Sequence, residues 1–207
     1  MVDIFSYVVR YDSGFAPNPF YGYCTLATCK PPIRKSARVG DWIVGSGSAS
    51  KTVNRGGRLV YAMRVAETPT FDEYSQDPRF EAKRPYRCGS RKQSCGDNIY
   101  FRPDPLAGWQ QRDSFHSQAN GQLHPSHVAR DTSVNRVLAS DNFVYFGGEG
   151  PIIPDLKDEK GRKLCKSGIG LTRFSCPALV KELEAWLASL KVKGYQGSPF
   201  EWISLRA

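Results

Sequence analysis

Apolar residues along the chain fall into short runs that predict strands, and into one helical period near the C-terminal end. The segment from Asp3 to Asp12 predicts a central strand, because both of its faces carry bulky side chains and the alternation is weak. Residues 39–45 predict a turn and a second strand, and residues 58–66 a third, which is rich in β-branched and aromatic side chains. Two further short strands are predicted over residues 98–102 and 142–148.

The helical period covers residues 177–190. Pro177 suits a first helical turn, Gly194 is a candidate stop, and one face is apolar, with Leu179, Leu183, Trp186, Leu187 and Leu190. Thr70 precedes Glu73 by three residues, the spacing of a capping box, and predicts a short helix. Between residues 24 and 37 we expect a short helix that is broken at Pro31 and Pro32.

Composition narrows the fold class. The 14 prolines and 19 glycines among 207 residues fit a loop-rich domain better than a helical bundle. The length and the 40% of hydrophobic residues predict one domain over residues 1–207, of the α+β class. The first residues lack the pattern of a signal peptide, so we expect a cytoplasmic protein without a membrane span, whose six cysteines are reduced thiols.

The net charge of +9 favours a polyanionic partner, because phosphates attract lysine and arginine whatever the fold. The densest basic segment lies within residues 81–102. Four of its side chains are candidate phosphate contacts: Arg84, Arg87, Arg91 and Lys92. A solvated surface is the more common role of such a segment. The net charge of +9 strengthens the phosphate-binding explanation relative to this one.

Familiar catalytic and metal-binding signatures are absent from the sequence. No phosphate-binding glycine-rich loop, dinucleotide fingerprint or zinc-deaminase spacing is found. The pairs Cys24/Cys29, Cys88/Cys95 and His124/His127 lack the close spacing of a zinc knuckle. We therefore predict no cofactor and favour buried or loop thiols and a solvated histidine pair over a metal site, with a structural zinc at Cys24/Cys29 or Cys88/Cys95 as the minority alternative.

Several motifs together resemble the second family of nucleotide modification-associated domains. They are Ala16-Pro-Asn-Pro-Phe20, Cys24-Thr-Leu-Ala-Thr-Cys-Lys-Pro-Pro-Ile-Arg34, Gly40-Asp-Trp-Ile-Val-Gly45 and Asn142-Phe-Val-Tyr-Phe-Gly-Gly148. The resemblance implies a DNA-modification or phage-conflict setting rather than a particular reaction. The order from Val39 to Phe80 is also similar to PUA-like and EVE-type domains, which implies a small β-barrel with short flanking helices and the C-terminal amphipathic helix.

Our first hypothesis is a module that recognises a modified nucleobase or nucleotide in nucleic acid. Aromatic side chains beside glycine and polar loops can stack on a base, although a buried core uses the same residues. The candidate ligand contacts are Phe20, Trp42 and Tyr145 for stacking, Asn18, Ser46 and Ser48 for hydrogen bonds, and Lys30 and Arg34 for phosphate.

Two other classes of function remain open. An enzyme acting on a nucleotide or modified base would use Asp41, Asp72 or Glu73 as acid or base, and Cys24 or Cys29 as nucleophile. It ranks second, because spacing alone assembles no base, nucleophile and orienting group. A module that binds a small nucleotide or an acidic protein is the third class.

Overall fold

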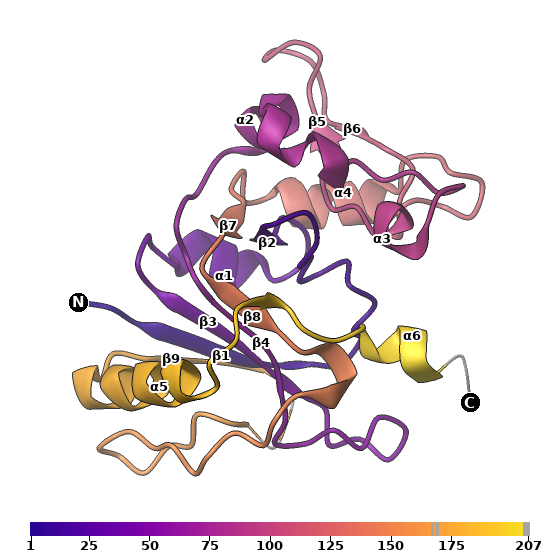
Figure 1. Cartoon of the computed structure of the whole chain (residues 1–207). Coiled ribbons are helices and arrows are strands. Elements are labelled where there is room, and N and C mark those ends of the chain that lie inside the picture. Colours follow the sequence, from indigo (N-terminus) through magenta and orange to yellow (C-terminus); the bar gives the residue numbers. More distant parts are fainter. Residues whose placement is uncertain (167, 169, 205–207) are drawn as a thin grey trace. The chain divides into compact units, whose positions relative to one another are not determined.

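A computed structural model describes residues 1–166, 168 and 170–204, and these form a mixed α/β fold (Figure 1). The chain divides into two units. The first contains residues 1–13, residues 37–66 and the chain from residue 140 onward, and the second contains residues 14–36 and 67–139. Both units are therefore assembled from separate stretches of sequence. The single domain over residues 1–207 stays a prediction.

A six-stranded sheet forms the centre of the first unit, in the order β10-β8-β4-β3-β1-β9. Its strands are β1 (Ile4–Val9), β3 (Trp42–Gly47), β4 (Leu59–Arg64), β8 (Phe143–Tyr145), β9 (Leu171–Phe174) and β10 (Gly194–Tyr195). β1 pairs in parallel with β3 and antiparallel with β9, so its predicted central position is confirmed. All six residues of β1 are buried, which explains its weak alternation.

The sheet is open. β9 and β10 are its edges, and the described residues form no closed barrel. The predicted mixture of a sheet with short helices and a C-terminal helix is confirmed, whereas the PUA-like barrel is not.

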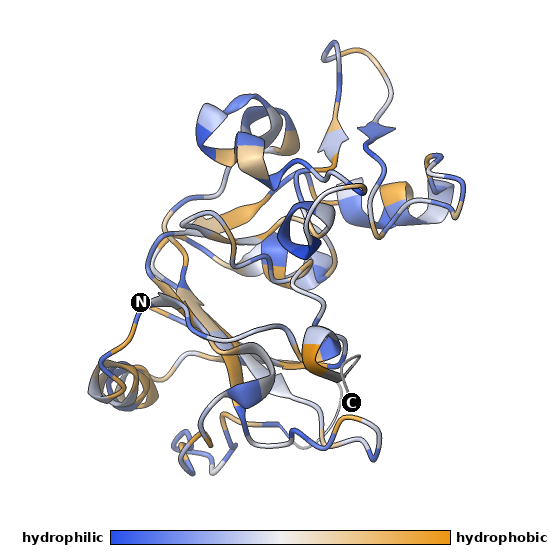
Figure 2. Cartoon of the chain, turned by 45° about the vertical axis from the view of Figure 1, so that its right-hand side comes forward, coloured by the Kyte–Doolittle hydropathy of each residue, from blue (hydrophilic) through white to orange (hydrophobic). Residues whose placement is uncertain are grey.

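One face of this sheet packs against α5 (Pro177–Ser189), the predicted amphipathic helix. Leu179 and Leu183 of the helix join Val44 and Ala62 of the sheet in one apolar cluster. Hydrophobic segments occur within the strands of the sheet (Figure 2). The prediction that Gly194 stops the helix is wrong, because Gly194 begins β10. The left-handed residue after the C-cap of α5 is Lys191, with φ 54°.

The face of the sheet opposite α5 carries tyrosines. Tyr7 and Tyr61 share a hydrogen bond of 2.9 Å between their hydroxyls, and the Tyr145 hydroxyl donates to Asp12 at 2.5 Å. Asp12 also accepts the Phe200 N–H at the start of α6 (Phe200–Ser204), at 3.0 Å. A 3-10 turn, η2 (Gly147–Glu149), follows β8.

The second unit consists of short elements around a separate apolar cluster. They are β2 (Cys24–Leu26), α1 (Pro31–Ser36), α2 (Phe71–Gln76), the 3-10 helix η1 (Pro78–Lys83), α3 (Arg91–Ser94), β5 (Tyr100–Phe101), β6 (Gln110–Gln111), α4 (Pro125–Thr132) and β7 (Leu138–Ser140). β2 pairs with β7, and β5 pairs with β6.

Local sequence signals explain some of these helices. The Thr70 hydroxyl accepts the Glu73 N–H and the Glu73 carboxylate accepts the Thr70 N–H, so the predicted capping box is confirmed. The break predicted at Pro31 and Pro32 is wrong, because both prolines begin α1. A proline fits the first helical turn, where its missing N–H has no partner to lose.

A buried polar network lies inside the second unit. The Lys83 ammonium donates to Asn18 O, Asn18 Oδ1 and Tyr23 O at 2.6–3.1 Å. Asp97 accepts hydroxyl protons from Thr25 and Tyr74, both at 2.7 Å. Burial lowers the pKa of Lys83 to about 8, although the charge of Asp97 works in the opposite direction. No described helix has the length and apolar character to cross a membrane.

Candidate nucleophile site at Cys29

Cys29 lies in a tight turn between β2 and α1. Its φ is 58° and that of Lys30 is 44°, so two consecutive residues with side chains occupy the left-handed region. This conformation is uncommon for residues other than glycine, and where it occurs it is concentrated at functional sites. The Cys29 side chain is partly buried.

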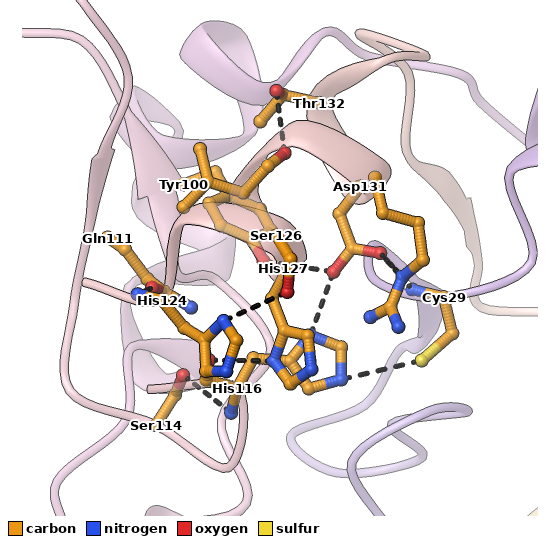
Figure 3. Close-up of polar contacts among 12 residues, drawn as sticks. Cys29, Tyr100, Gln111, Ser114, His116, His124, Ser126, His127, Asp131 and Thr132 are labelled. Carbon is orange, nitrogen blue, oxygen red and sulfur yellow. Dashed lines mark hydrogen bonds and ion pairs between the residues drawn. The ribbon is translucent and has the colours of Figure 1, made fainter. Parts of the chain in front are cut away.

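The thiol of Cys29 faces a histidine, which in turn contacts an aspartate (Figure 3). The Cys29 Sγ is 3.5 Å from His116 Nε2, and His116 Nδ1 is 2.8 Å from Asp131 Oδ2. With Nδ1 directed at the carboxylate, Nε2 is the ring nitrogen that faces the thiol. The order of nucleophile, base and orienting carboxylate is that of a catalytic triad.

The carboxylate of Asp131 is fully buried, and each of its oxygens accepts two hydrogen bonds. Oδ2 accepts from Tyr100 and interacts with His116, while Oδ1 accepts the Cys29 N–H and the Arg130 side chain. Burial by itself would raise the pKa of Asp131, but the hydrogen bonds and charges of His116 and Arg130 outweigh it and lower the pKa to about 2. Asp131 is therefore a carboxylate at neutral pH.

The charge of Asp131 acts on the imidazole. Burial tends to lower the pKa of His116, but the hydrogen bonds and charges of Asp131 and Cys29 outweigh it and raise the pKa to about 9. His116 is therefore protonated at neutral pH and places a positive charge beside the Cys29 sulfur. An imidazolium next to a thiol favours the thiolate, which is the nucleophilic form.

Arg34 holds this arrangement together. Its guanidinium donates to Cys29 O on one side and to Asp131 O, Val134 O and Arg136 O on the other, at 2.6–3.0 Å. It thus links the turn that carries Cys29 to the C-terminal end of α4, which carries Asp131. The side chain of Arg34 is fully buried and its donors are taken by the backbone, so it positions Cys29 and presents no surface to a phosphate.

Aromatic rings surround His116. The ring centroid of Phe15 is 4.8 Å from that of His116 and 5.7 Å from that of Phe115. Phe115 is 44% exposed, and the guanidinium carbon of Arg87 lies 4.5 Å from its centroid. A partly exposed ring and a cation of the predicted basic segment therefore lie close to the triad.

Two further histidines stack beside the triad. The His127 ring is 4.6 Å from His116 and 4.1 Å from His124, and His127 Nδ1 is 2.9 Å from His116 O. Within the described residues, no group of three or more histidine, cysteine, aspartate and glutamate side chains is placed to hold a metal ion. Burial lowers the pKa of His127, so this ring is neutral where His116 is charged.

Lys30, Asn18 and Phe20, the other predicted ligand contacts in the second unit, have different surroundings. Lys30 follows Cys29 directly, and its carbonyl accepts the Arg34 N–H. Asn18 is buried, with its amide donating to Gly14 O and Cys95 O. Phe20 is 2% exposed, with the Lys92 ammonium 5.8 Å from its centroid.

The predicted contacts of the first unit do not form one pocket. Trp42 and Tyr145 face opposite sides of the sheet, since Trp42 pairs with Arg64 while Tyr145 pairs with Tyr61, an odd number of residues away on β4. Ser46 is buried, and Ser48 accepts the Ser50 N–H at 3.2 Å. A stacking pair of Trp42 and Tyr145 on one base is thereby ruled out.

Cys24 and Asp41, the two residues named first for the enzyme alternative, are both buried within the fold. Cys24 is fully buried in β2, and burial raises the pKa of its thiol, so it is a poor nucleophile. Asp41 is buried and accepts the N–H groups of Asp3 and Arg38, both at 2.8 Å. Asp41 therefore fixes the turn before β3.

The basic segment has two kinds of side chain. Arg84 is paired with Glu81 at 3.2 Å and also donates to Ser75 O. Arg87, Arg91 and Lys92 are exposed. Arg91 and Lys92 are the first two residues of α3. Their role as phosphate contacts stays a prediction.

His116 and Asp131 were not predicted as functional residues. Cys29, His116 and Asp131 are far apart in the sequence, so no local motif contains them. α4, which carries Asp131, has Val128 and Ala129 as its apolar residues, too few to produce a helical period. The usable signals were the free cysteine before a proline pair and the three histidines of one polar stretch.

Comparison with known proteins identifies the family. The family described as nucleotide modification associated domain 2 matches residues 1–206, and the chain belongs to this family. The match covers both units. No curated protein and no solved structure matches the chain.

Proposed function

We propose that the protein is a cysteine-dependent enzyme that acts on an acyl group carried by a nucleotide or modified base. The observation that carries this proposal is the line from Cys29 Sγ through His116 to Asp131, with separations of 3.5 and 2.8 Å. Membership of a nucleotide modification family supports the substrate class. Cys29, an alternative nucleophile in the sequence, takes the role first given to Cys24.

The proposed reaction has two steps. The Cys29 thiolate, paired with the His116 imidazolium, bonds through its sulfur to the acyl carbon, and the imidazolium gives its Nε2 proton to the departing alcohol or amine. Water then gives a proton to His116 and its oxygen bonds to the thioester carbon. The Cys29 sulfur leaves as the thiolate and His116 keeps the proton, so the starting pair is restored and the net change is hydrolysis of the acyl bond. Asp131 keeps the imidazole oriented throughout.

Neighbouring residues support a nucleotide substrate. Phe115 offers a partly exposed ring beside His116, and Arg87 lies over that ring. A base can stack on such a ring while an arginine meets its phosphate. The buried Thr28 hydroxyl, directly before Cys29, has no hydrogen-bond partner within the described part of the chain.

The first test measures thiol reactivity with iodoacetamide at pH 7, by mass spectrometry of each cysteine. Cys88 is exposed and serves as a control within the same molecule. We expect partly buried Cys29 to react faster than Cys88, and His116→Gln to slow Cys29 about tenfold without changing Cys88. If Cys29 reacts more slowly than Cys88 and His116→Gln has no effect on it, the proposed nucleophile is wrong.

The second test measures release of the acyl group from acylated nucleotides. Cys29→Ala should reduce the rate by at least about 1,000-fold, since nucleophilic catalysis is lost. Cys88→Ala is the matched control and should leave the rate unchanged. A Cys29→Ala protein that retains full activity would refute the mechanism.

A reader of modified bases is the second candidate. It is supported by the exposed cations Arg87, Arg91 and Lys92, and by the order of the Gly40–Asp41 turn, β3 and β4, which is the order that a PUA-like relationship implies. In this candidate the protein binds nucleic acid in a DNA-modification or phage-defence setting without changing it. Equal affinity for matched modified and unmodified oligonucleotides at one salt concentration would contradict it.

A further inference from the structure

A cavity of about 690 Å³ lies between α5 and the sheet of the first unit. Trp42, Ala62 and Val144 line it from three neighbouring strands. Glu184 and Leu187 line it from α5. Its volume falls within the range of small-molecule sites, which is about 300–1,000 Å³.

The indole of Trp42 is fixed in this wall. Its Nε1–H donates to Glu184 Oε1 at 3.0 Å, and the same carboxylate oxygen is 3.7 Å from Arg64 Nη1. Arg64 also donates to Gly40 O at 3.2 Å. The ring therefore offers a preorganised apolar surface, and ordering it costs no further entropy when a ligand binds.

The charge at the cavity is positive. Arg64, Lys191 and Lys193 line it together with the single carboxylate of Glu184. Lys191 and Lys193 are exposed, and within the described ranges neither forms an ion pair with a carboxylate. They follow the C-terminal end of α5, so two exposed cations belong to the lining of a mainly apolar cavity.

We propose that this cavity binds a small anionic ligand with a flat, apolar ring system. The ring lies against Trp42, Ala62 and Val144, and the anionic group lies at Lys191 and Lys193. This inference is independent of the proposed enzyme, whose residues all belong to the second unit. Apolar walls with a few charged groups at the mouth are the usual composition of such sites.

The test uses two fluorescent probes of similar ring structure. 1-Anilinonaphthalene-8-sulfonate is anionic, and N-phenyl-1-naphthylamine is neutral. We compare the wild type with the double variant Lys191→Glu/Lys193→Glu and with a control, Lys51→Glu/Lys181→Glu. The control has the same change of charge at exposed lysines of the same unit that do not line the cavity.

We expect the sulfonate to bind the Lys191→Glu/Lys193→Glu variant about tenfold more weakly than the wild type or the control, and the neutral probe to bind all three equally. Equal sulfonate affinity in the two double variants would overturn the anionic part of the proposal.

A third variant tests the cavity itself. Ala188 is exposed and lines the cavity, so Ala188→Trp fills it from the helix surface without removing a core contact. Both probes should lose most of their affinity, while circular dichroism stays that of the wild type. Unchanged binding of both probes to this folded variant would show that they bind elsewhere and would overturn the proposal.

Discussion

The titration of His116 predicts a pH dependence of stability that a single substitution removes. The side chain of His116 is 11% exposed, and Asp131 and Cys29 raise its pKa from 6.5 to about 9. Because each pKa unit corresponds to about 1.4 kcal/mol, the folded state favours the imidazolium by roughly 3 kcal/mol. This is a contribution to the free energy of unfolding, since the unfolded chain lacks the partners of His116.

The sign of the effect follows from the raised pKa. Below pH 6.5 the histidine is protonated in both the folded and the unfolded chain, so the full contribution is present. Between pH 6.5 and about 9 the unfolded chain loses the proton first, and the contribution falls to nearly zero as the pH passes 9. His116→Gln has no such titration.

Urea unfolding of the wild type and His116→Gln at pH 6, 7, 8 and 9 measures the difference. The wild type should exceed the variant by roughly 3 kcal/mol more at pH 6 than at pH 9. Taking the difference cancels other groups that titrate in both proteins, Lys83 among them. His127→Gln is the control, and because the pKa of His127 is lowered, any pH dependence that it removes has the opposite sign and lies below pH 6.5. A constant difference between wild type and His116→Gln would refute the assigned electrostatics of the site.

Three further substitutions test the fold. Lys83→Met should lower the free energy of unfolding by about 3–5 kcal/mol, because it removes the buried cation near Asp97 and three hydrogen bonds; a loss below 1 kcal/mol in urea unfolding would contradict this. Thr70→Ala should cost about 1 kcal/mol by removing the N-cap of α2, measured in the same way, and Thr52→Ala, an exposed threonine outside any helix, should cost much less. Tyr145→Phe should cost about 1–3 kcal/mol, since it leaves the Asp12 carboxylate without its hydroxyl donor, and an unchanged melting temperature would argue against this bond.

The elements that the sequence predicted best are those with a long apolar pattern of their own. β1, β3, β4 and β8 lie in apolar or β-branched runs and α5 has a helical period, and these patterns can be recognised without knowledge of the rest of the chain. The barrel was a different kind of prediction. Closure depends on which strands lie at the edges, and β9 and β10 are short segments that local patterning does not single out.

The candidate site also combines residues that the local sequence indicates with residues that only the fold brings together. Cys29 was among the possible nucleophiles because it lies close in the sequence to the expected ligand contacts. Its partners come from a polar stretch and from a helix with little apolar character, so only the folded chain brings them to the sulfur. Arg34 was predicted to be a phosphate contact because of its charge, but the structure uses that charge to bind four backbone carbonyls. The sequence alone does not reveal that the hydrogen-bond donors of a charged side chain are used by the protein's own backbone.

The interleaving of the two units has a consequence for synthesis and for engineering. Every residue of the second unit has been made once Ala139 leaves the ribosome, whereas β1 waits for β9 at the far end of the chain before both of its neighbours exist. The unit with Cys29 is thus the first that can be completed, and the unit with the N-terminus is the last. For the same reason no single cut releases either unit as one continuous fragment, so domain truncation is a poor way to study them, and point variants of the full chain are the appropriate tool.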